Sequence, residues 1–446
     1  MQPPTSDLDV DRQPPLSLPF AHFLVGALLL LIGGGVASLG PLVLPIRASS
    51  VGTLHLLLAG WLGLTIMGAM IQFVPVWSGR KLYSERLSLV SLWLVVLGVS
   101  GIVGVFFSSA YAWFPVTAGI LLLGFWLFGY TIVRSMPPVS EMDITEAHFL
   151  LAVGSLLLAT VFGWLLATSF AYRILDPLPI SASGLLLAHL TLTVFGFVSL
   201  TIVGALYQLG PMFTQAAPSR IDTHLAHVEM ISLPVGVFVL AFGRLLEAPI
   251  FGRFGATLVL AGLSAFALIL IRRLWGAQVA RGPMLRRYWL VGLSVLGWVA
   301  LTTPRWLADP LSYFLRFGSP RATHLLFVGF FTLTVVGTFY HVVPFIVWFH
   351  EYSDRLGYEP VPMIDDLYHS GLARVEFALL AIGLLTLWVG EVLGAPTWVI
   401  VVGGNVFGGG VILFAINMGL VVWNHRPETI SEVVELITFR RSEREN

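Results

Sequence analysis

One residue pattern occurs three times along this chain, and it constrains the fold more than any other feature. Each copy has the form [His/Thr]-x4-Gly-x7-Gly-x3-[Gln/His]-x2-Pro, without gaps, at 55–75, 191–211 and 324–344. The first position holds His55, Thr191 and His324 in turn. About 135 residues separate one copy from the next, which is enough for about four membrane-length segments. We therefore predict three related units of four helices, arranged in a ring.

Composition places these units in a membrane. Hydrophobic residues make up 57% of the 446 residues and charged residues 11%, with a mean hydropathy of +0.88, which excludes an ordinary soluble domain. The predicted fold class is all-α: a polytopic membrane protein with twelve transmembrane helices in three pseudo-repeats of four. We expect the helices at 19–46, 51–77, 87–108, 111–134, 147–171, 181–213, 224–246, 249–271, 287–304, 318–349, 369–391 and 395–424.

The domain organisation follows from these spans. Residues 1–18 form an N-terminal tail and residues 425–446 a C-terminal tail. The transmembrane domain between them, 19–424, divides into repeats at about 19–134, 147–271 and 287–424. Residues 429–440 have helical apolar spacing, which predicts a short amphipathic helix lying on membrane lipid.

Basic residues predict the orientation. More of them fall on the side of the termini, among them Arg80, Lys81 and Arg86, than on the opposite side, so both termini are expected to be cytoplasmic. Residues 1–16 lack the apolar core of a cleavable signal, and the first helix is the expected insertion signal. Lys81 is the single lysine, a preference typical of a GC-rich prokaryote, so we expect a multi-pass protein of the prokaryotic cell membrane. A formal net charge of +0 argues against a nucleic-acid partner.

Histidine and proline mark opposite ends of a pattern helix, because twenty residues of helix cover about 30 Å, the hydrocarbon thickness. His55 and His324 should therefore lie at the same depth, toward the external side. Two imidazoles in related positions are the geometry expected for axial ligands of a haem iron, and an intramembrane histidine is costly without a partner. The chain has no cysteine, so the haem would be held non-covalently. The alternative is two separate interfacial histidines.

The residues around these histidines resemble a known family. The segment 55–79, which ends Gln-Phe-Val-Pro-Val-Trp-Ser-Gly, is similar to the second transmembrane helix of haem-copper oxidase subunit I, and 324–344 is similar to its tenth helix. The resemblance covers nearly the whole chain and implies one low-spin haem b held by His55 and His324. The segment 74–80 also resembles the NnrS-type haem- and copper-containing proteins linked to nitric oxide stress. The His-x-His-Glu-Met of that group is missing at 53–57.

The sequence departs from the oxidase family at the oxygen-reducing centre. The positions of the high-spin haem ligand, the first copper histidine and the cross-linked tyrosine hold Ala322, Thr191 and Phe195. The end of the seventh helix, 236–246, lacks the family's His-His pair. Copper needs about three imidazoles, so copper is a cofactor that the ligand positions do not support. His189 keeps a second site open, as a ligand for haem or copper or as a packing histidine, and Thr191 is expected to bond its own helix backbone.

Other polar residues have supporting roles in this interpretation. His341 replaces the glutamine of the other two copies and is expected to handle protons. Acidic residues in the spans are placed near helix ends, without a continuous proton path; they are Glu229, Glu376 and Glu391. External arginines are expected to pair with haem propionates, and the candidates are Arg47, Arg173, Arg305 and Arg316.

The sequence leaves four functions open. The first is respiratory-type electron transfer, or handling of nitric oxide or oxygen, by a low-spin haem b protein with a small respiratory subunit, a cytochrome or a quinol as partner. The second is an oxidoreductase with relocated ligands, of the cytochrome c oxidase, quinol oxidase or nitric oxide reductase type. The third is an NnrS-like nitric oxide stress protein. The fourth is a transporter or structural subunit without haem.

Overall fold

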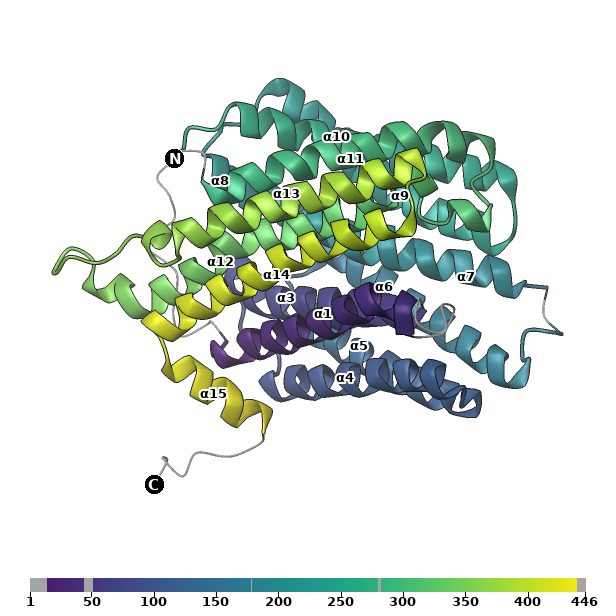
Figure 1. Cartoon of the computed structure of the whole chain (residues 1–446), viewed down its shortest axis with the longest axis horizontal. Coiled ribbons are helices and arrows are strands. Elements are labelled where there is room, and N and C mark those ends of the chain that lie inside the picture. The colour runs from purple at the N-terminus through teal and green to yellow at the C-terminus, as the bar shows by residue number, and fades with distance from the viewer. Residues whose placement is uncertain (1–13, 44–50, 178, 280–281, 439–446) are drawn as a thin grey trace. The chain divides into compact units, whose positions relative to one another are not determined.

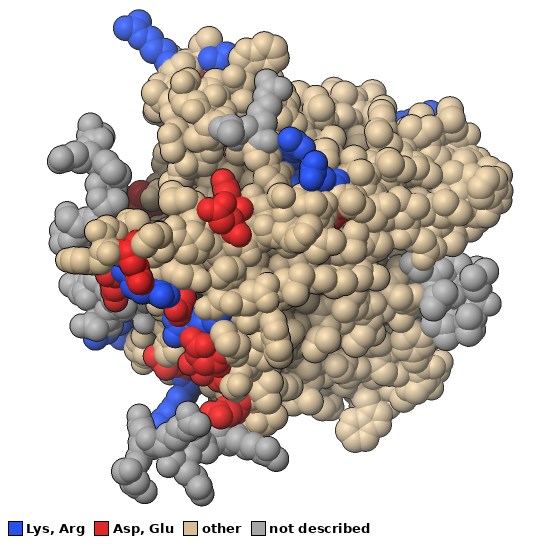
Figure 2. Space-filling model, turned by 60° about the vertical axis from the view of Figure 1, so that its left-hand side comes forward, with Lys and Arg blue, Asp and Glu red and all other residues tan. Residues whose placement is uncertain are grey.

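The computed structural model describes residues 14–438 except 44–50, 178 and 280–281. Within these residues it contains twelve helices long and apolar enough to cross a membrane, and no β-strand. The prediction of an all-α polytopic membrane protein is confirmed. In Figure 2 most of the charged side chains on this face lie in its left-hand part, and the rest of the face is almost free of charge.

The helices fall into two compact units, and each is described here by itself. The first unit is 1–182 with 428–446, and the second is 183–427. The division follows the first helix of the predicted second repeat, so the first and third predicted repeats each lie within one unit. In Figure 1 the long helices of each unit run roughly parallel or antiparallel to one another.

The first unit holds five spans and one surface helix. Its elements are α1 (Ser17–Val43), the π-helix η2 (His55–Leu62) continuing into α3 (Gly63–Ser78), α4 (Glu85–Ser108), α5 (Phe114–Ser135), α6 (Ile144–Tyr172) and α15 (Glu428–Ile437). The helix α15 is the predicted amphipathic segment, and it packs against α1 with Val433 buried. The predicted helix there is confirmed as far as Ile437.

The second unit holds seven spans. Its elements are α7 (Ala182–Thr191), the π-helix η5 (Leu192–Ser199) and α8 (Leu200–Thr214), α9 (Arg220–Leu245), α10 (Pro249–Trp275), α11 (Pro283–Ala308), the 3-10 turn η7 (Pro320–Ala322), the π-helix η8 (Leu325–Thr332) and α12 (Leu333–Tyr352), α13 (Ser370–Leu393) and α14 (Thr397–His425). These bounds lie within a few residues of the predicted spans, since continuous apolar sequence has few other solutions in a bilayer.

The three helices that carry the pattern share a backbone feature. Each contains an eight-residue π-helical segment that starts at its first or second pattern residue, and each has the pattern proline closer to its other end. We call these three the pattern helices: 51–78, 182–214 and 324–352. They are also the most buried spans, with 67% to 78% of their central residues buried against 28% to 61% in the other nine described spans. Short π segments inside α-helices occur frequently at functional sites.

Glycines hold the last two helices of each repeat close together. Gly98 on α4, Gly236 on α9 and Gly383 on α13 face the next helix along the chain, and a Cβ at any of them would lie 2.6 Å from a backbone atom of that helix. Small residues at such contacts let helix backbones approach in a membrane. These glycines provide a common reference for comparing the repeats.

Candidate functional site

His55 is the first residue of the π-helix η2. Its ring nitrogen Nδ1 lies 2.9 Å from the carbonyl oxygen of Val51, one turn earlier, and the side chain is half-buried. A carbonyl oxygen only accepts, so Nδ1 carries the proton and Nε2 keeps its lone pair. This is the tautomer that a metal-binding histidine requires.

His324 directly precedes the π-helix η8. Its Nδ1 lies 3.0 Å from Oε2 of Glu391, in the last turn of α13, and its backbone N–H donates to the same oxygen at 3.4 Å. The side chains are 26% and 18% exposed, so the contact is half-buried. A carboxylate beside Nδ1 favours the proton on that nitrogen and leaves Nε2 for a ligand.

Both candidate ligands, His55 and His324, have an oxygen close to Nδ1, a carbonyl oxygen in the first and a carboxylate oxygen in the second. In His55 the Nδ1 nitrogen is hydrogen-bonded to a carbonyl oxygen, whereas in His324 it lies 3.0 Å from a carboxylate oxygen without hydrogen-bond geometry. Metal-bound histidines almost always present Nδ1 to such an oxygen, which fixes the ring and raises its basicity. The residues present fit an axial haem ligand on this criterion. His55 belongs to the first unit and His324 to the second, and each is described within its own unit.

In the second pattern helix the first pattern residue is a threonine, and it has different partners. The hydroxyl of Thr191 donates to the carbonyl of Leu187 at 2.6 Å, which confirms the expected bond to its own helix. The same hydroxyl accepts a hydrogen bond of 2.8 Å from Nη1 of Arg244. His189 is half-buried on α7, and its carbonyl accepts a bond from Thr193. Its role as a ligand stays a prediction.

Arg244, at the end of α9, is fully buried. Nothing in the sequence marked Arg244 as part of a site, yet it fills the space next to Thr191. Besides Thr191, its guanidinium donates at 3.0–3.3 Å to backbone carbonyls of the segment after α11, those of Pro310, Leu315 and Arg316. A guanidinium with neutral oxygen partners is held firmly but stays positively charged.

Aromatic rings complete this filling. The rings of Phe195, Trp298 and Trp306 lie 5.4–5.5 Å from one another, centroid to centroid, and the guanidinium of Arg244 stacks 5.2 Å from the centre of the Trp306 ring. Thr191 and Phe195 are two of the positions at which the sequence predicted no copper ligand and no tyrosine. Packed side chains and one cation occupy these positions in this chain.

A second buried cluster lies in the third repeat. Arg287 on α11 and Glu376 on α13, both fully buried, form an ion pair. Glu376 also accepts a hydrogen bond of 3.2 Å from the hydroxyl of Tyr340, which in turn accepts one of 3.1 Å from Asn417. Glu376 lies within two turns of the start of α13, and its side chain is fully buried.

This cluster ends beside the connection between α12 and α13. Tyr368 packs edge to face on Tyr340 with ring centres 5.2 Å apart, and its hydroxyl donates to Asp365 at 3.2 Å. Burial, together with the nearby carboxylate of Asp365, raises the pKa of Tyr368 above its ordinary value. The hydroxyl therefore stays protonated and acts as a donor.

In the second repeat, Glu229 occupies the position that Glu376 has in the third. It lies inside α9 with no exposed surface, and it accepts a hydrogen bond of 2.7 Å from the hydroxyl of Tyr207 on α8. The sequence offered one signal for both pairs, because each glutamate lies two turns before a close-packed glycine, Gly236 or Gly383.

The first helix of each repeat carries a buried basic residue that the sequence analysis did not align. His22, His148 and Arg287 have 0–2% of their surface exposed, and each directs a side-chain nitrogen to the carbonyl four residues earlier, at 2.6–2.8 Å. The repeated Ala-His-Phe-Leu at 21–24 and 147–150 was the available signal. Among the described residues, Nε2 of His22 has no hydrogen-bond partner.

The remaining predicted residues are His341 and the four external arginines. His341 lies between the rings of Phe213 and Phe345, at 4.7 and 6.0 Å. Arg173 pairs with Asp176 at the surface, and Arg316 stacks on Tyr313. Arg305 is exposed, and Arg47 lies outside the described residues. Pairing of these arginines with propionates stays a prediction.

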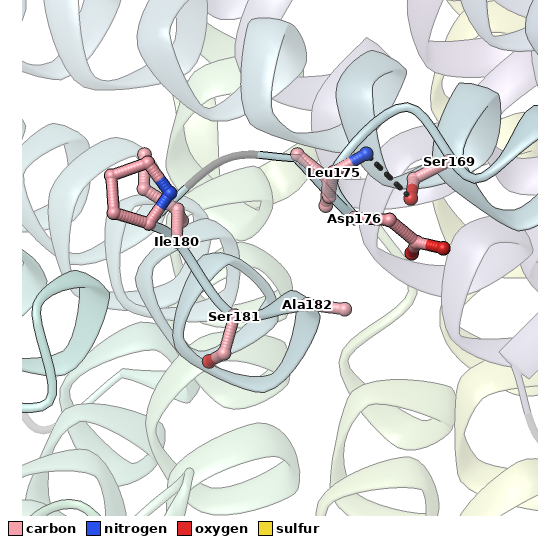
Figure 3. Close-up of a pocket in the computed structure, with 7 residues that line it drawn as sticks. Ser169, Leu175, Asp176, Ile180, Ser181 and Ala182 are labelled. Carbon is pink, nitrogen blue, oxygen red and sulfur yellow. Dashed lines mark hydrogen bonds between the residues drawn. The ribbon is translucent and has the colours of Figure 1, made fainter.

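One open hollow lies on the first unit, where α6 leads into α7. Figure 3 shows it between the end of α6 and the start of α7, with a volume of about 380 Å³. Ser169 Oγ accepts a hydrogen bond of 3.4 Å from the backbone of Leu175 at its edge. No histidine lines it, so we do not assign it to the redox site.

Comparison with known proteins gives no family for this chain. No family model matches it, and no curated protein matches its sequence. In the part of the chain that the structure describes, no three histidine, aspartate or glutamate side chains gather as a metal site would need.

Proposed function

We propose that this chain is a membrane haem b protein in which His55 and His324 are the two axial ligands of one low-spin haem. One observation carries the proposal. Both histidines stand at the start of a π-helical segment in related helices, and both direct Nδ1 toward an oxygen, so that Nε2 is available. Glu391 would orient His324, and the carbonyl of Val51 would orient His55.

The role that fits this pair is electron transfer. A haem with two histidine ligands supplies a one-electron carrier when bound. The chain's own contribution is to fix both imidazoles, to exclude water with the apolar faces of the pattern helices and to set the basicity of His324 through Glu391. Transfer within a respiratory chain, with a cytochrome, a quinol or a small subunit as partner, is the activity we propose, in a cell membrane with both termini cytoplasmic.

Handling of nitric oxide or oxygen is the second candidate. It would need a coordination position that is open to the gas. His189 is the residue that would serve it. The filling of the neighbouring space by Arg244 and Phe195 favours electron transfer over an oxidase or reductase with relocated ligands. An NnrS-like function and a haem-free transporter are the remaining alternatives.

The test is a reduced-minus-oxidised spectrum of the purified protein with metal analysis. One six-coordinate haem b per chain, unreactive with carbon monoxide, is the expected result. His55→Ala and His324→Ala should each abolish the low-spin band, and His189→Ala, the control, should leave it intact. A band that survives in both single variants, or a colourless wild-type protein, would contradict the ligand assignment. Carbon monoxide binding would favour gas handling.

A further inference from the structure

The chain reaches His324 through the connection 309–323, which follows α11. The second half of this connection is covered, because Phe317, Ser319 and Ala322 expose only 0–7% of their surface. Ala322 donates its backbone N–H to the carbonyl of Ser319 at 2.9 Å, which closes a 3-10 turn two residues before His324. The contacts that hold this connection therefore also decide where the backbone of His324 lies.

Three side chains of α11 hold the connection from one side. Each makes a hydrogen bond of 2.8–3.0 Å with the backbone of the connection. They are Trp298, Thr302 and Trp306, which bond Phe317, Ser319 and Leu315 in turn. Gly318 lies between two of these partners with a φ of +93°, a conformation that favours glycine. A Cβ at Gly318 would lie 2.5 Å from Oγ1 of Thr302 and 2.8 Å from the ring of Trp298, so the connection has no room to move toward α11.

Arg244 holds the same connection from the end of α9. Its guanidinium donates to the backbone carbonyls of Pro310, Leu315 and Arg316 at 3.0–3.3 Å and to the hydroxyl of Thr191 at 2.8 Å. A guanidinium is a rigid fork of donors, and a buried acceptor that loses its donor is costly to leave unpaired. One side chain thus ties together four oxygens, three of which belong to the connection.

Arg253 on α10 makes similar bonds that stop short of the connection. It donates to the carbonyls of Leu307 and Ala308 at 3.2 and 3.1 Å, the last two residues of α11. Its side chain is exposed, so water can replace these bonds. Arg253 is therefore a matched control for Arg244, because it binds carbonyls directly before the connection and has no hydrogen bond to 309–323 among the described residues.

We propose that Arg244 is a positioning residue for His324, because it holds the connection 309–323 in the place from which its last turn presents the imidazole as a ligand. This inference rests on the proposed function, in which His324 is an axial ligand of haem. Thr191 supports Arg244 through its hydroxyl. The second copy of the pattern has no histidine at its first position, and this position instead supports the ligand of the third copy.

The ligand needs this support at its backbone as well as at its ring. Glu391 lies beside Nδ1 of His324 and orients the imidazole, but the start of η8 is placed by the turn before it. The groups of a functional site have to be held within about 0.5 Å of their working geometry. Without Arg244 the connection loses three bonds, and His324 would occupy its ligand position only part of the time.

The first experiment compares haem coordination in Arg244→Met, Gly318→Ala and the control Arg253→Met. In both test variants part of the haem should lose its sixth ligand and bind carbon monoxide, whereas the control should keep the six-coordinate spectrum. A variant that is merely less stable would give a lower yield of protein with an unchanged spectrum. Gly318→Ala displaces the connection from the α11 side and leaves Arg244 in place, so it carries the test if Arg244→Met does not fold.

The second experiment follows the connection without using haem. The chain has no cysteine, so Ser319→Cys places a single thiol at a position that is 4% exposed. A maleimide should label this thiol about tenfold or more faster when Arg244→Met is added, because several lost hydrogen bonds favour local opening. Adding Arg253→Met instead should leave the labelling rate unchanged.

Two results would overturn the inference. One is unchanged haem coordination in both Arg244→Met and Gly318→Ala, even if labelling becomes faster, since the connection would then move without His324. The other is an unchanged labelling rate in Arg244→Met. A colourless wild-type protein contradicts the proposed function and this inference together, whereas unchanged coordination in a protein that does bind haem contradicts the inference alone.

Discussion

The first pattern residues of the three pattern helices, His55, Thr191 and His324, lie in the same backbone conformation but differ in chemistry. At His55 and His324 an imidazole has its Nδ1 beside an oxygen, whereas at Thr191 a hydroxyl accepts from a buried arginine. All three precede or begin a π-helical segment. The difference teaches that the repeat fixes where a side chain stands, while its neighbours from other helices decide what it can do.

The largest effect that would sharpen this comparison is on the arginine. Arg244→Met should lower the free energy of unfolding by roughly 3 kcal/mol or more, because several buried oxygens lose a charged donor at once. Thermal unfolding in detergent would measure it. Arg253→Met is the matched control, since this exposed arginine of α10 also donates to backbone carbonyls. Equal loss in both variants would mean that burial of Arg244 is unimportant.

A smaller effect is expected at the partner of His324. Glu391→Ala removes the carboxylate beside Nδ1 and should weaken haem retention by about ten- to a hundredfold, the usual cost of losing such a partner. Haem release to an apo-protein acceptor would measure it. Glu351→Ala, which breaks an ion pair with Arg355 elsewhere in the same unit, is the control. Unchanged retention in Glu391→Ala would separate the carboxylate from the haem site.

The smallest effect is expected at Thr191, the first pattern residue of the second copy. Thr191→Val deletes one acceptor of Arg244 and should cost about 1 kcal/mol of stability. Thr193→Val is closely matched, because Thr193 also bonds the carbonyl four residues earlier but receives no bond from Arg244. If the two variants lose the same stability, as a thermal melt would reveal, the bond from Arg244 to Thr191 contributes nothing.

The helices of this protein were predictable, and the reason is physical. A bilayer allows few backbones other than helix for apolar stretches, so the spans from 51–77 to 395–424 could be placed within a few residues. The bond from Thr191 to its own helix followed from the known habit of threonine in helices. Local rules of this kind depend on neighbours in sequence alone.

The partners of the candidate residues were not predictable in the same way. Glu391 was recognised as an acidic residue near a helix end, but its contact with His324 arises because α13 packs against η7 and η8. Arg244 was not singled out, because the sequence does not reveal that the segment after α11 covers it with carbonyl groups. Such partners come from segments 66 or more residues away, and one sequence does not pair them.

The π-helical segments have a consequence for how this scaffold tolerates change. Each widened turn accommodates one more residue than an α-helix would, which rotates the rest of the helix by about 100°. Deleting one residue inside 55–62 would tighten the turn and keep the helix, but every downstream side chain would point into the wrong neighbour. The first pattern residue can therefore change, as Thr191 illustrates. The number of residues in the π-helical segment beside it has to be preserved in all three copies.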